Sequence, residues 1–118
     1  MRYRVEFAAA TERDFELIFD HLLESYASFG EGLDEAATHA AQRVIAIRKA
    51  AARLATAPLR GAARDDVQSG VRHLTIDRAT YWFEVDESAR RVRVLAVFFG
   101  GQDQLRRMLM RLLSEDRG

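Results

Sequence analysis

Apolar and polar positions alternate most regularly between residues 70 and 101, where the period is two residues. In the middle of this stretch one parity is aromatic or aliphatic and the other is mixed: Tyr81, Phe83 and Val85 against Thr80, Trp82 and Glu84. Such alternation is typical of a strand whose two faces have different surroundings. Two polar turns divide the stretch into three consecutive strands, and the last, residues 92–99, is apolar at nearly every position from Val94 onward. We therefore predict that this last strand lies inside a sheet, with both faces covered.

The chain before residue 58 has one short strand, residues 3–7, followed by apolar positions at the three- and four-residue steps of helices. We expect the first helix to begin at Thr11 as N-cap, with Asp14 completing a capping box. Its apolar stripe consists of Phe15, Ile18, Phe19, Leu22, Leu23 and Tyr26. Two glycines end this helix, Asp34 is placed to cap a second one, and Pro58 ends the second. The stripe of the second helix is Ala37, Ala40, Val44, Ile47, Ala51 and Leu54.

The remaining segments complete one domain, residues 1–118. Residues 59–69 have no hydrophobic period and predict a loop. A closing helix is expected after Gly101, with an apolar stripe of Leu105, Met108, Leu109, Leu112 and Leu113 and with Arg106, Arg107 and Arg111 outside. The order strand, helix, helix, three strands, helix predicts an α+β fold. We expect a small antiparallel sheet packed against a helical hairpin, with helices on one face of the sheet.

Composition narrows the classes of function. The chain has no cysteine, which excludes disulfides and thiolate chemistry. Without an apolar leader or a run of about 20 apolar residues, we expect a cytoplasmic protein. The formal net charge is zero, yet acidic residues dominate up to Glu35 and only basic ones occur from Ala36 to Arg64. This basic block either binds an anionic partner or packs beside the acidic segment, so that the two neutralise each other.

The sequence offers no recognisable catalytic set. No serine lies in a nucleophile elbow, and His21, His39 and His73 fall on separate elements without the spacing of metal ligands. The glycines at 100 and 101 precede a helix but lack the lysine of a phosphate-binding loop. We therefore expect no catalytic residue, no metal and no cofactor.

Arg72 is the most informative polar residue. It shares strand parity with Leu74 and Ile76, so its side chain begins on an apolar face, where an unpaired cation is costly. Two interpretations stay open. Arg72 either locks its strand to the helical hairpin through a salt bridge or backbone carbonyls, or binds phosphate together with Arg60 and Arg64.

The order of elements resembles the RelE/ParE superfamily of toxins over nearly the whole chain. The segments that carry the resemblance are RDFELIFDHL (13–22), LATAPLRG (54–61), GVRHLTI (70–76), YWFEVDE (81–87) and VRVLAVFFGGQD (92–103). The resemblance implies the toxin of a type II, plasmid-stabilisation-type toxin–antitoxin module. It also implies a cognate antitoxin that lays an acidic amphipathic segment across the toxin.

The superfamily has two mechanisms. RelE-like members resemble a ribosome-dependent mRNA endonuclease, which needs a base and several cations around one phosphate. Arg72 matches the family's strand arginine, but the last strand ends in Phe98 and Phe99 where a nuclease carries another arginine. His73 and Asp103 remain as a candidate base and acid, yet Arg72 and His73 point to opposite faces of their strand. ParE-like members resemble inhibitors of DNA gyrase that act by binding, and this branch fits better.

The expected partner-binding residues follow from that preference. We expect gyrase to contact Arg60, Arg64, Arg72, Phe98, Phe99, Gln102 and Asp103. For the antitoxin we expect a face of the second helix, where small side chains between cations form either a docking groove or an ordinary solvated surface. Its residues are Arg43, Ala46, Arg48, Lys49, Ala50 and Arg53. An mRNA endonuclease and a degenerate, non-toxic binding module of the same fold are the alternatives.

Overall fold

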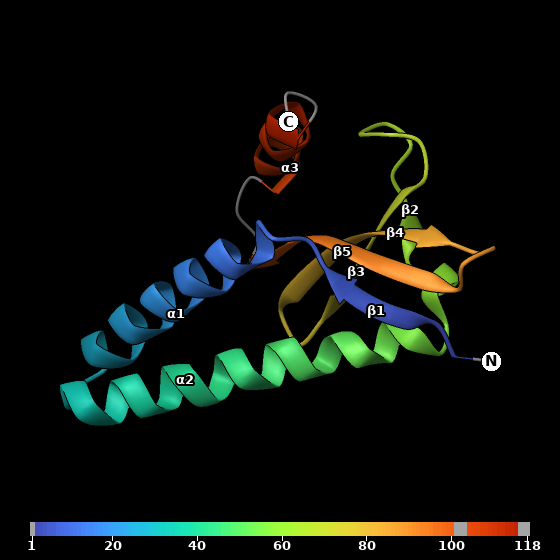
Figure 1. Ribbon diagram of the computed structural model, residues 1–118. Coiled ribbons are helices and arrows are strands. Elements are labelled where there is room, and N and C mark those ends of the chain that lie inside the picture. The colour runs from blue at the N-terminus through green and yellow to red at the C-terminus, as the bar shows by residue number, and fades with distance from the viewer. Residues whose placement is uncertain (1, 101–103, 116–118) are drawn as a thin grey trace.

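The structure, a computed structural model, describes residues 2–100 and 104–115 (Figure 1). It contains three α-helices, two short 3-10 helices and five strands within these residues. In chain order they are β1 (Arg4–Phe7), α1 (Thr11–Ser28), α2 (Leu33–Ala50), η1 (Ala51–Ala55), η2 (Pro58–Arg60), β2 (Ala62–Ala63), β3 (Val71–Ile76), β4 (Ala79–Asp86), β5 (Arg91–Phe99) and α3 (Gln104–Glu115). The predicted α+β order is confirmed.

The sheet has the strand order β1-β5-β4-β3-β2. Strands β2 to β5 pair antiparallel, whereas β1 runs parallel to β5, with Arg4 opposite Arg91 and Phe7 opposite Val94. The sheet is therefore mixed rather than purely antiparallel. The two-residue strand β2 lies in the segment that the sequence predicted to be a loop. As expected, β5 lies inside the sheet and has a strand on each side.

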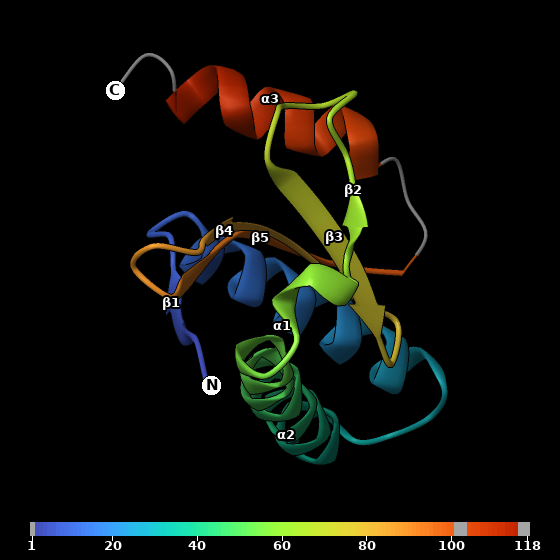
Figure 2. The same ribbon diagram turned by 90° about the vertical axis from the view of Figure 1, so that its right-hand side faces the viewer.

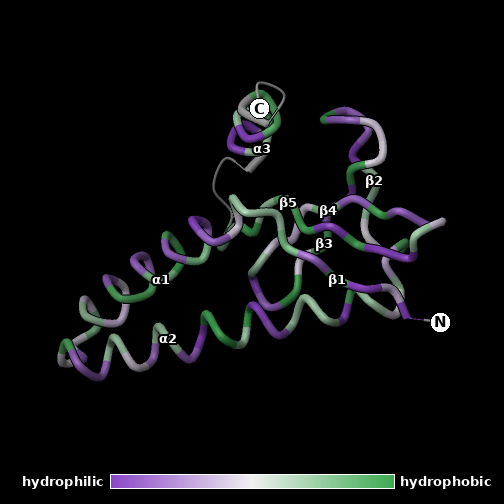
Figure 3. Tube along the Cα trace, in the orientation of Figure 1, coloured by the Kyte–Doolittle hydropathy of each residue, from purple (hydrophilic) through white to green (hydrophobic). Residues whose placement is uncertain are grey.

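Helices cover both faces of the sheet, not one. The α1–α2 hairpin lies below it and α3 lies above it in Figure 1, and the view in Figure 2 agrees. Phe15, Ile18 and Leu22 of the first helix pack on Tyr81 and Phe83, which confirms the stripe of α1. On the other face, Met108 and Leu112 of α3 pack on a second cluster formed by Val71, Trp82, Leu95, Ala96 and Phe98. Hydrophilic and hydrophobic segments alternate along α1 and α2 (Figure 3).

Side chains of β5 alternate between the two clusters, and a register shift between Trp82 and Phe83 interrupts this alternation at Leu95. Val94 and Val97 face the hairpin, while the consecutive Leu95 and Ala96 both belong to the cluster under α3. An extra residue in one strand breaks the strict alternation of faces. The continuous apolar run of β5 is thus shared between two cores.

Both predicted helix caps are wrong. The N-cap of α1 is Ala10, and Thr11 lies inside the helix, where its hydroxyl donates to the Ala8 carbonyl at 2.7 Å. The N-cap of α2 is Gly32, so Asp34 lies in the first turn instead of capping it. Asp14 is buried and does not cap the helix. Its carboxylate accepts a hydrogen bond from the backbone of β5 instead.

Candidate functional site

The edge of β5 is closed by a buried ion pair. Strand β1 covers this edge only as far as Val94, whose carbonyl accepts from the Ala8 N–H at 2.8 Å. Beyond it, the Val97 N–H donates to Asp14 Oδ2 at 3.0 Å and Arg111 Nη1 donates to the Leu95 carbonyl at 2.9 Å. Arg111 Nη2 and Asp14 Oδ1 are 2.6 Å apart, and the Asp14 side chain has no exposed surface. Arg111, predicted to face outward, therefore fastens α3 to both α1 and β5.

A cleft of about 320 Å³ lies next to this ion pair, at the end of β5. We call it the β5-end cleft, and the residues that line it are Leu17, Ile18, His21, Arg78, Val97, Phe98, Phe99, Gly100 and Arg107. None of these described residues is acidic. The Arg107 guanidinium lies 4.3 Å from the Phe98 ring centre, and those of Arg78 and Arg43 lie 5.4 and 5.6 Å from that of Phe99. Cations at these distances are attracted to the faces of the rings.

The β3–β4 turn holds Arg78 in this position. Asp77 and Arg78 both have positive φ angles, 49° and 73°, as the two central residues of a tight hairpin turn. That backbone region favours glycine or asparagine, so an arginine there is strained. The Arg78 carbonyl accepts a hydrogen bond from the Gly100 N–H at 3.0 Å, which joins the turn to the end of β5.

A second and larger cleft, about 720 Å³, lies at the opposite end of β5 around Arg72. Its residues are Leu59, Gly70, Arg72, Glu84, Val85, Asp86, Glu87, Ser88, Arg91 and Arg93. Arg72 Nη1 donates to the carbonyls of Gly61 at 2.8 Å and Leu59 at 3.3 Å, which is the backbone-carbonyl interpretation. The cleft carries both signs of charge. The Ala89 N–H and the Ser88 hydroxyl hold the pKa of Asp86 below its usual range.

The predicted gyrase-binding residues do not form one surface. Phe98 and Phe99 line the β5-end cleft, whereas Arg72 lines the larger cleft. Through Phe83 of β4, Arg72 lies level with Val94, near the middle of β5. Val94 and Phe99 are five residues apart, which is roughly 16 Å at about 3.3 Å per residue. Arg60 is exposed near the Arg72 cleft. Gln102 and Asp103 lie outside the described residues.

Arg64 is held by its own loop. Its guanidinium makes two hydrogen bonds to Asp66, at 2.9 and 2.8 Å, and lies 5.1 Å from the Trp82 ring centre. These hydrogen bonds lower the pKa of Asp66. His73 stacks on Trp82 with ring centres 4.9 Å apart, and burial together with the charge of Arg64 lowers the pKa of His73.

The predicted antitoxin-binding residues do not form one surface either. Ala46, Lys49 and Arg53 are exposed and Ala50 is half-buried. Arg48 turns toward α1, where it donates to both Glu12 oxygens at 3.1 and 3.0 Å and lies 4.3 Å from the Phe15 ring centre. These hydrogen bonds and the Arg48 charge lower the pKa of Glu12.

Arg43 does not lie on the predicted antitoxin-binding face of α2 either. It donates to the Asp77 carbonyl at 2.7 Å, beneath the β3–β4 turn. Sequence reasoning placed Arg43 with the cations of α2, whereas the structure places it beside the Phe99 ring with Arg78.

Two chains from solved toxin–antitoxin complexes are similar to this one. One comes from the RelBE2 complex of Mycobacterium tuberculosis, with 18% sequence identity, coverage of 84% of this chain and 92% of that chain, and a TM-score of 0.50. The other comes from the chromosomal ParDE system of P. aeruginosa, with 20% identity, coverage of 84% and 97%, and a TM-score of 0.55. This chain has the RelE/ParE toxin fold. No family model and no curated protein matches its sequence.

Within this RelE/ParE fold, the sheet face beneath α3 is packed with apolar side chains. Trp82, Phe98 and Met108 there are each at most 1% exposed. Arg72 pairs with Phe83 and His73 with Trp82, so the arginine and the histidine lie on opposite faces, as predicted. Among the residues that the structure describes, no group of three or more His, Asp or Glu could hold a metal ion. None of the described helices is long and apolar enough to span a membrane.

Proposed function

We propose that this chain is the toxin of a type II toxin–antitoxin module, acts in the cytoplasm and is neutralised by a cognate antitoxin. The observation that carries the proposal is the fold, shared over 84% of the chain with members of the RelBE2 and ParDE complexes. Fold alone admits several functions, so the target is argued from the surface.

We further propose that the toxin acts by binding DNA gyrase, not by cleaving RNA. The proposal is supported by the contacts that Arg72 and His73 already make within the protein. Arg72 is engaged by two backbone carbonyls, and the face that carries His73 is filled by Trp82 and α3. A phosphodiester-cleaving site needs a base and free cations around one phosphate.

The test is a supercoiling assay with purified gyrase, in parallel with mRNA cleavage on translating ribosomes. A gyrase-binding toxin inhibits supercoiling and leaves mRNA intact. Codon-linked cleavage without supercoiling inhibition would contradict the gyrase proposal. Overexpression without growth arrest would instead indicate a degenerate binding module.

Exposed cations near the Arg72 cleft make the contact residues testable. Replacing Arg60 and Arg72 together should relieve growth arrest, because both lie on this side of the sheet. Since Arg72 also holds the segment from Leu59 to Gly61, thermal unfolding of the variant must be compared with that of Arg72→Lys, which keeps the charge. Arrest that persists in a folded double variant would show that this surface does not contact the target.

The nuclease remains the second candidate, favoured by one observation. The β5-end cleft combines the His21 imidazole with the guanidinium groups of Arg78 and Arg107. These are the group types that RNA cleavage requires. Loss of ribosomal mRNA cleavage in a His21→Ala variant would support it.

For the antitoxin we propose that Lys49 and Arg53, both exposed on the second helical segment, steer an acidic partner. Charge reversal at these two residues should slow association most at low salt. An unchanged association rate constant would count against this face. Arg48 is unsuited to the experiment because it already pairs with Glu12.

A further inference from the structure

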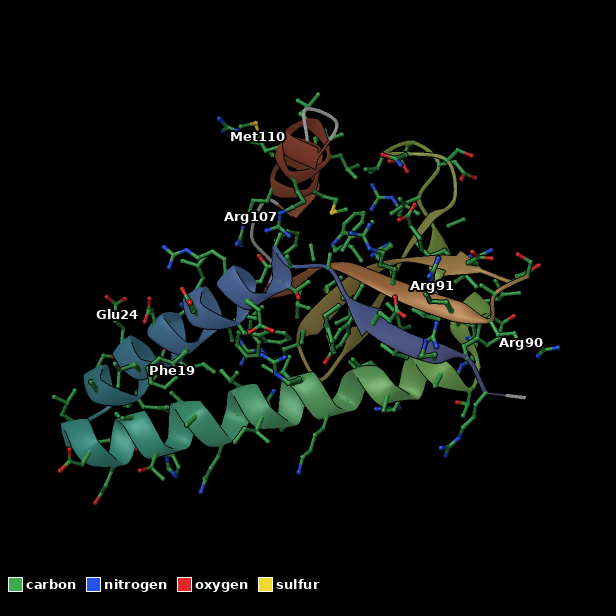
Figure 4. The ribbon with its side chains drawn as sticks, in the orientation of Figure 1. Phe19, Glu24, Arg90, Arg91, Arg107 and Met110 are labelled. Carbon is green, nitrogen blue, oxygen red and sulfur yellow. The ribbon has the colours of Figure 1, made fainter. Side chains whose placement is uncertain are left out.

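The outer face of α3 leaves apolar side chains exposed to solvent. Met108 and Leu112 pack on the sheet, whereas the opposite side of the helix carries a second row at the spacing i, i+3, i+4 and i+7, which is one helix face. We call this row the outer stripe of α3, and its residues are Arg106, Leu109, Met110 and Leu113. The three apolar members are 41, 60 and 60% exposed, and Met110 projects away from the sheet in Figure 4. A helix that is apolar on both sides is expected to be covered on both.

A groove between α1 and α2 has the complementary character. Its volume is about 440 Å³, and we call it the hairpin groove. The residues that line it are Glu12, Phe15, Glu16, Phe19, Asp20, Val44 and Arg48. Phe19 lies between the two helices in Figure 4 and forms an apolar floor together with Phe15 and Val44. The three acids are spaced four residues apart, so they form a row along one side of α1.

Each of the two surfaces has one charge available for a partner. In the groove, Glu12 pairs with Arg48 at 3.0 Å and Glu16 pairs with Arg13 at 2.8 Å. The exposed Asp20 forms no ion pair with the residues that the structure describes. On α3, Arg111 is engaged by Asp14, whereas the exposed Arg106 has no acidic partner within the described ranges.

The two surfaces match in length but cannot meet within one molecule. From Arg106 to Leu113 the outer stripe spans about 10 Å, and from Glu12 to Asp20 the acidic row spans about 12 Å. The α1–α2 hairpin and α3 lie on opposite faces of the sheet (Figures 1 and 2). The Arg111 ion pair and the packing of Met108 hold α3 on its own face. A second copy of the chain supplies the missing surface in each case.

We propose that two copies of this chain form a two-fold dimer, in which the outer stripe of α3 from each copy docks into the hairpin groove of the other. The apolar side chains of the stripe cover the floor of the groove, and Arg106 lies against the acidic row at Asp20. A two-fold axis uses the contact twice and closes the assembly, whereas a head-to-tail repeat leaves both surfaces open at its ends. Each contact is small, so we expect a weak dimer with a dissociation constant in the micromolar range. The proposal does not depend on the toxin function.

An anionic lipid surface fits the outer stripe less well. Basic amphipathic helices also bind such surfaces, but lipid recognition typically uses clusters of roughly four to eight cations. Only Arg106 and Arg107 are exposed cations on the described part of α3, because Arg111 is held by Asp14. A lipid surface would also leave the acidic groove without a partner, whereas a second copy covers both surfaces.

The test reverses one charge on each surface and then mixes the variants. Asp20→Lys changes the groove, and Arg106→Glu changes the stripe. The matched controls are Glu87→Lys and Arg90→Glu, two exposed residues of the β4–β5 turn that lie outside both surfaces. Sedimentation velocity over a range of protein concentrations at low salt measures the dissociation constant of the dimer. Since all four side chains are exposed, thermal unfolding should show that each variant folds like the parent chain.

We expect the parent chain and both controls to dimerise equally. Each reversal at Asp20 or Arg106 should weaken the dimer about tenfold, a change of about 1.4 kcal/mol, because a two-fold dimer contains every substitution twice. An equimolar mixture of Asp20→Lys and Arg106→Glu should regain the affinity, since both contacts of the mixed dimer again join opposite charges. Higher salt should weaken the parent dimer.

Four results would overturn the proposal. They are a parent chain that stays monomeric at its highest soluble concentration, a dimer that Arg106→Glu leaves unchanged, a mixture no tighter than its components, and assembly that continues beyond the dimer. Sedimentation of a monomeric parent chain with phosphatidylserine vesicles, lost in Arg106→Glu, would assign the stripe to lipid instead. Growth arrest by a chain that never dimerises would leave the toxin proposal standing without this one, and a dimer without growth arrest would do the reverse.

Discussion

Arg111 is the residue whose role departs most from the pattern around it. The spacing within α3 groups it with Arg106 and Arg107 on the polar side, but it pairs with Asp14, 97 positions earlier. The hydrophobic periodicity of a helix predicts which of its faces is buried. It contains no information on a charged residue in another element. The same limit applies to Asp14, whose position three residues after a threonine resembles a helix cap.

The Asp14–Arg111 pair should matter far more than the exposed ion pairs. Arg111→Met leaves the Asp14 carboxylate buried without its partner, so it should lower the free energy of unfolding by roughly 3–5 kcal/mol, and Asp14→Asn should cost less because Arg111 is partly exposed. The double variant should lose less than the sum of the two. Urea unfolding measures this, with Arg13→Met as control, because the exposed Arg13–Glu16 pair contributes at most about 1 kcal/mol. Additive losses would contradict direct coupling.

Gly61 is required for space, not for its backbone angle. An added Cβ would lie 2.7 Å from Phe83 Cζ and 3.1 Å from the His73 carbonyl oxygen, while φ is an ordinary −66°. Gly61→Ala should therefore destabilise the fold by about 1–3 kcal/mol in chemical unfolding. The control is Gly32→Ala, where a Cβ meets nothing within 4 Å and only the poorer N-cap preference of alanine, about 0.5–1 kcal/mol, is expected. Equal effects at both sites would refute the steric account.

At the scale of elements, alternation was enough to predict β3 and β4, and a continuous apolar run was enough to predict β5. It could not reveal β2, whose two alanines have no period, nor that β1 joins the sheet parallel to β5. The second helical layer was missed because the apolar run of β5 serves two cores, one on each face of the sheet. A continuous apolar run indicates burial on both faces but does not name what covers each.

The amphipathic docking of α3 gives a paired prediction. Met108, on the face of α3 that packs on the sheet, is fully buried, and the next residue, Leu109, is 41% exposed. Met108→Ala should lower the free energy of unfolding by about 2–5 kcal/mol, whereas Leu109→Ala should change it much less. Thermal or urea unfolding of the two variants checks this, and equal losses would mean that α3 is not oriented as described.

Across the whole molecule, the acidic and basic halves of the sequence meet where α1 packs on α2. The Glu12–Arg48 pair joins them, which supports neutralisation as one use of the basic block. What the sequence could not predict is that Arg43 of this block meets Arg78 and Arg107, from outside the block, at the Phe98 and Phe99 rings. Of the β5-end cleft, the sequence predicted Phe98 and Phe99 only. The one available signal was a tight turn, Asp77–Arg78, without the glycine such turns favour.

Acid should destabilise the whole fold. Hydrogen bonds from Arg48, Arg64 and the Ala89 N–H lower the folded-state pKa of Glu12, Asp66 and Asp86, and burial lowers that of His73. The unfolded chain therefore binds more protons, so stability falls as pH drops below about 6.5 for His73 and again through about pH 4 for the carboxyls. Unfolding free energies measured from about pH 8 to about pH 2 test both declines. His73→Phe should remove the first decline only, and a decline that persists in this variant would assign it to another group.

The Asp14–Arg111 ion pair also determines when this part of the fold can close during synthesis. Asp14 leaves the ribosome early, but Val97 follows it by 83 residues and Arg111 by 97. Until those residues emerge, the carboxylate has no buried partner and the surface that α3 later covers stays open to water. Closure of this ion pair is thus among the last steps of folding during synthesis.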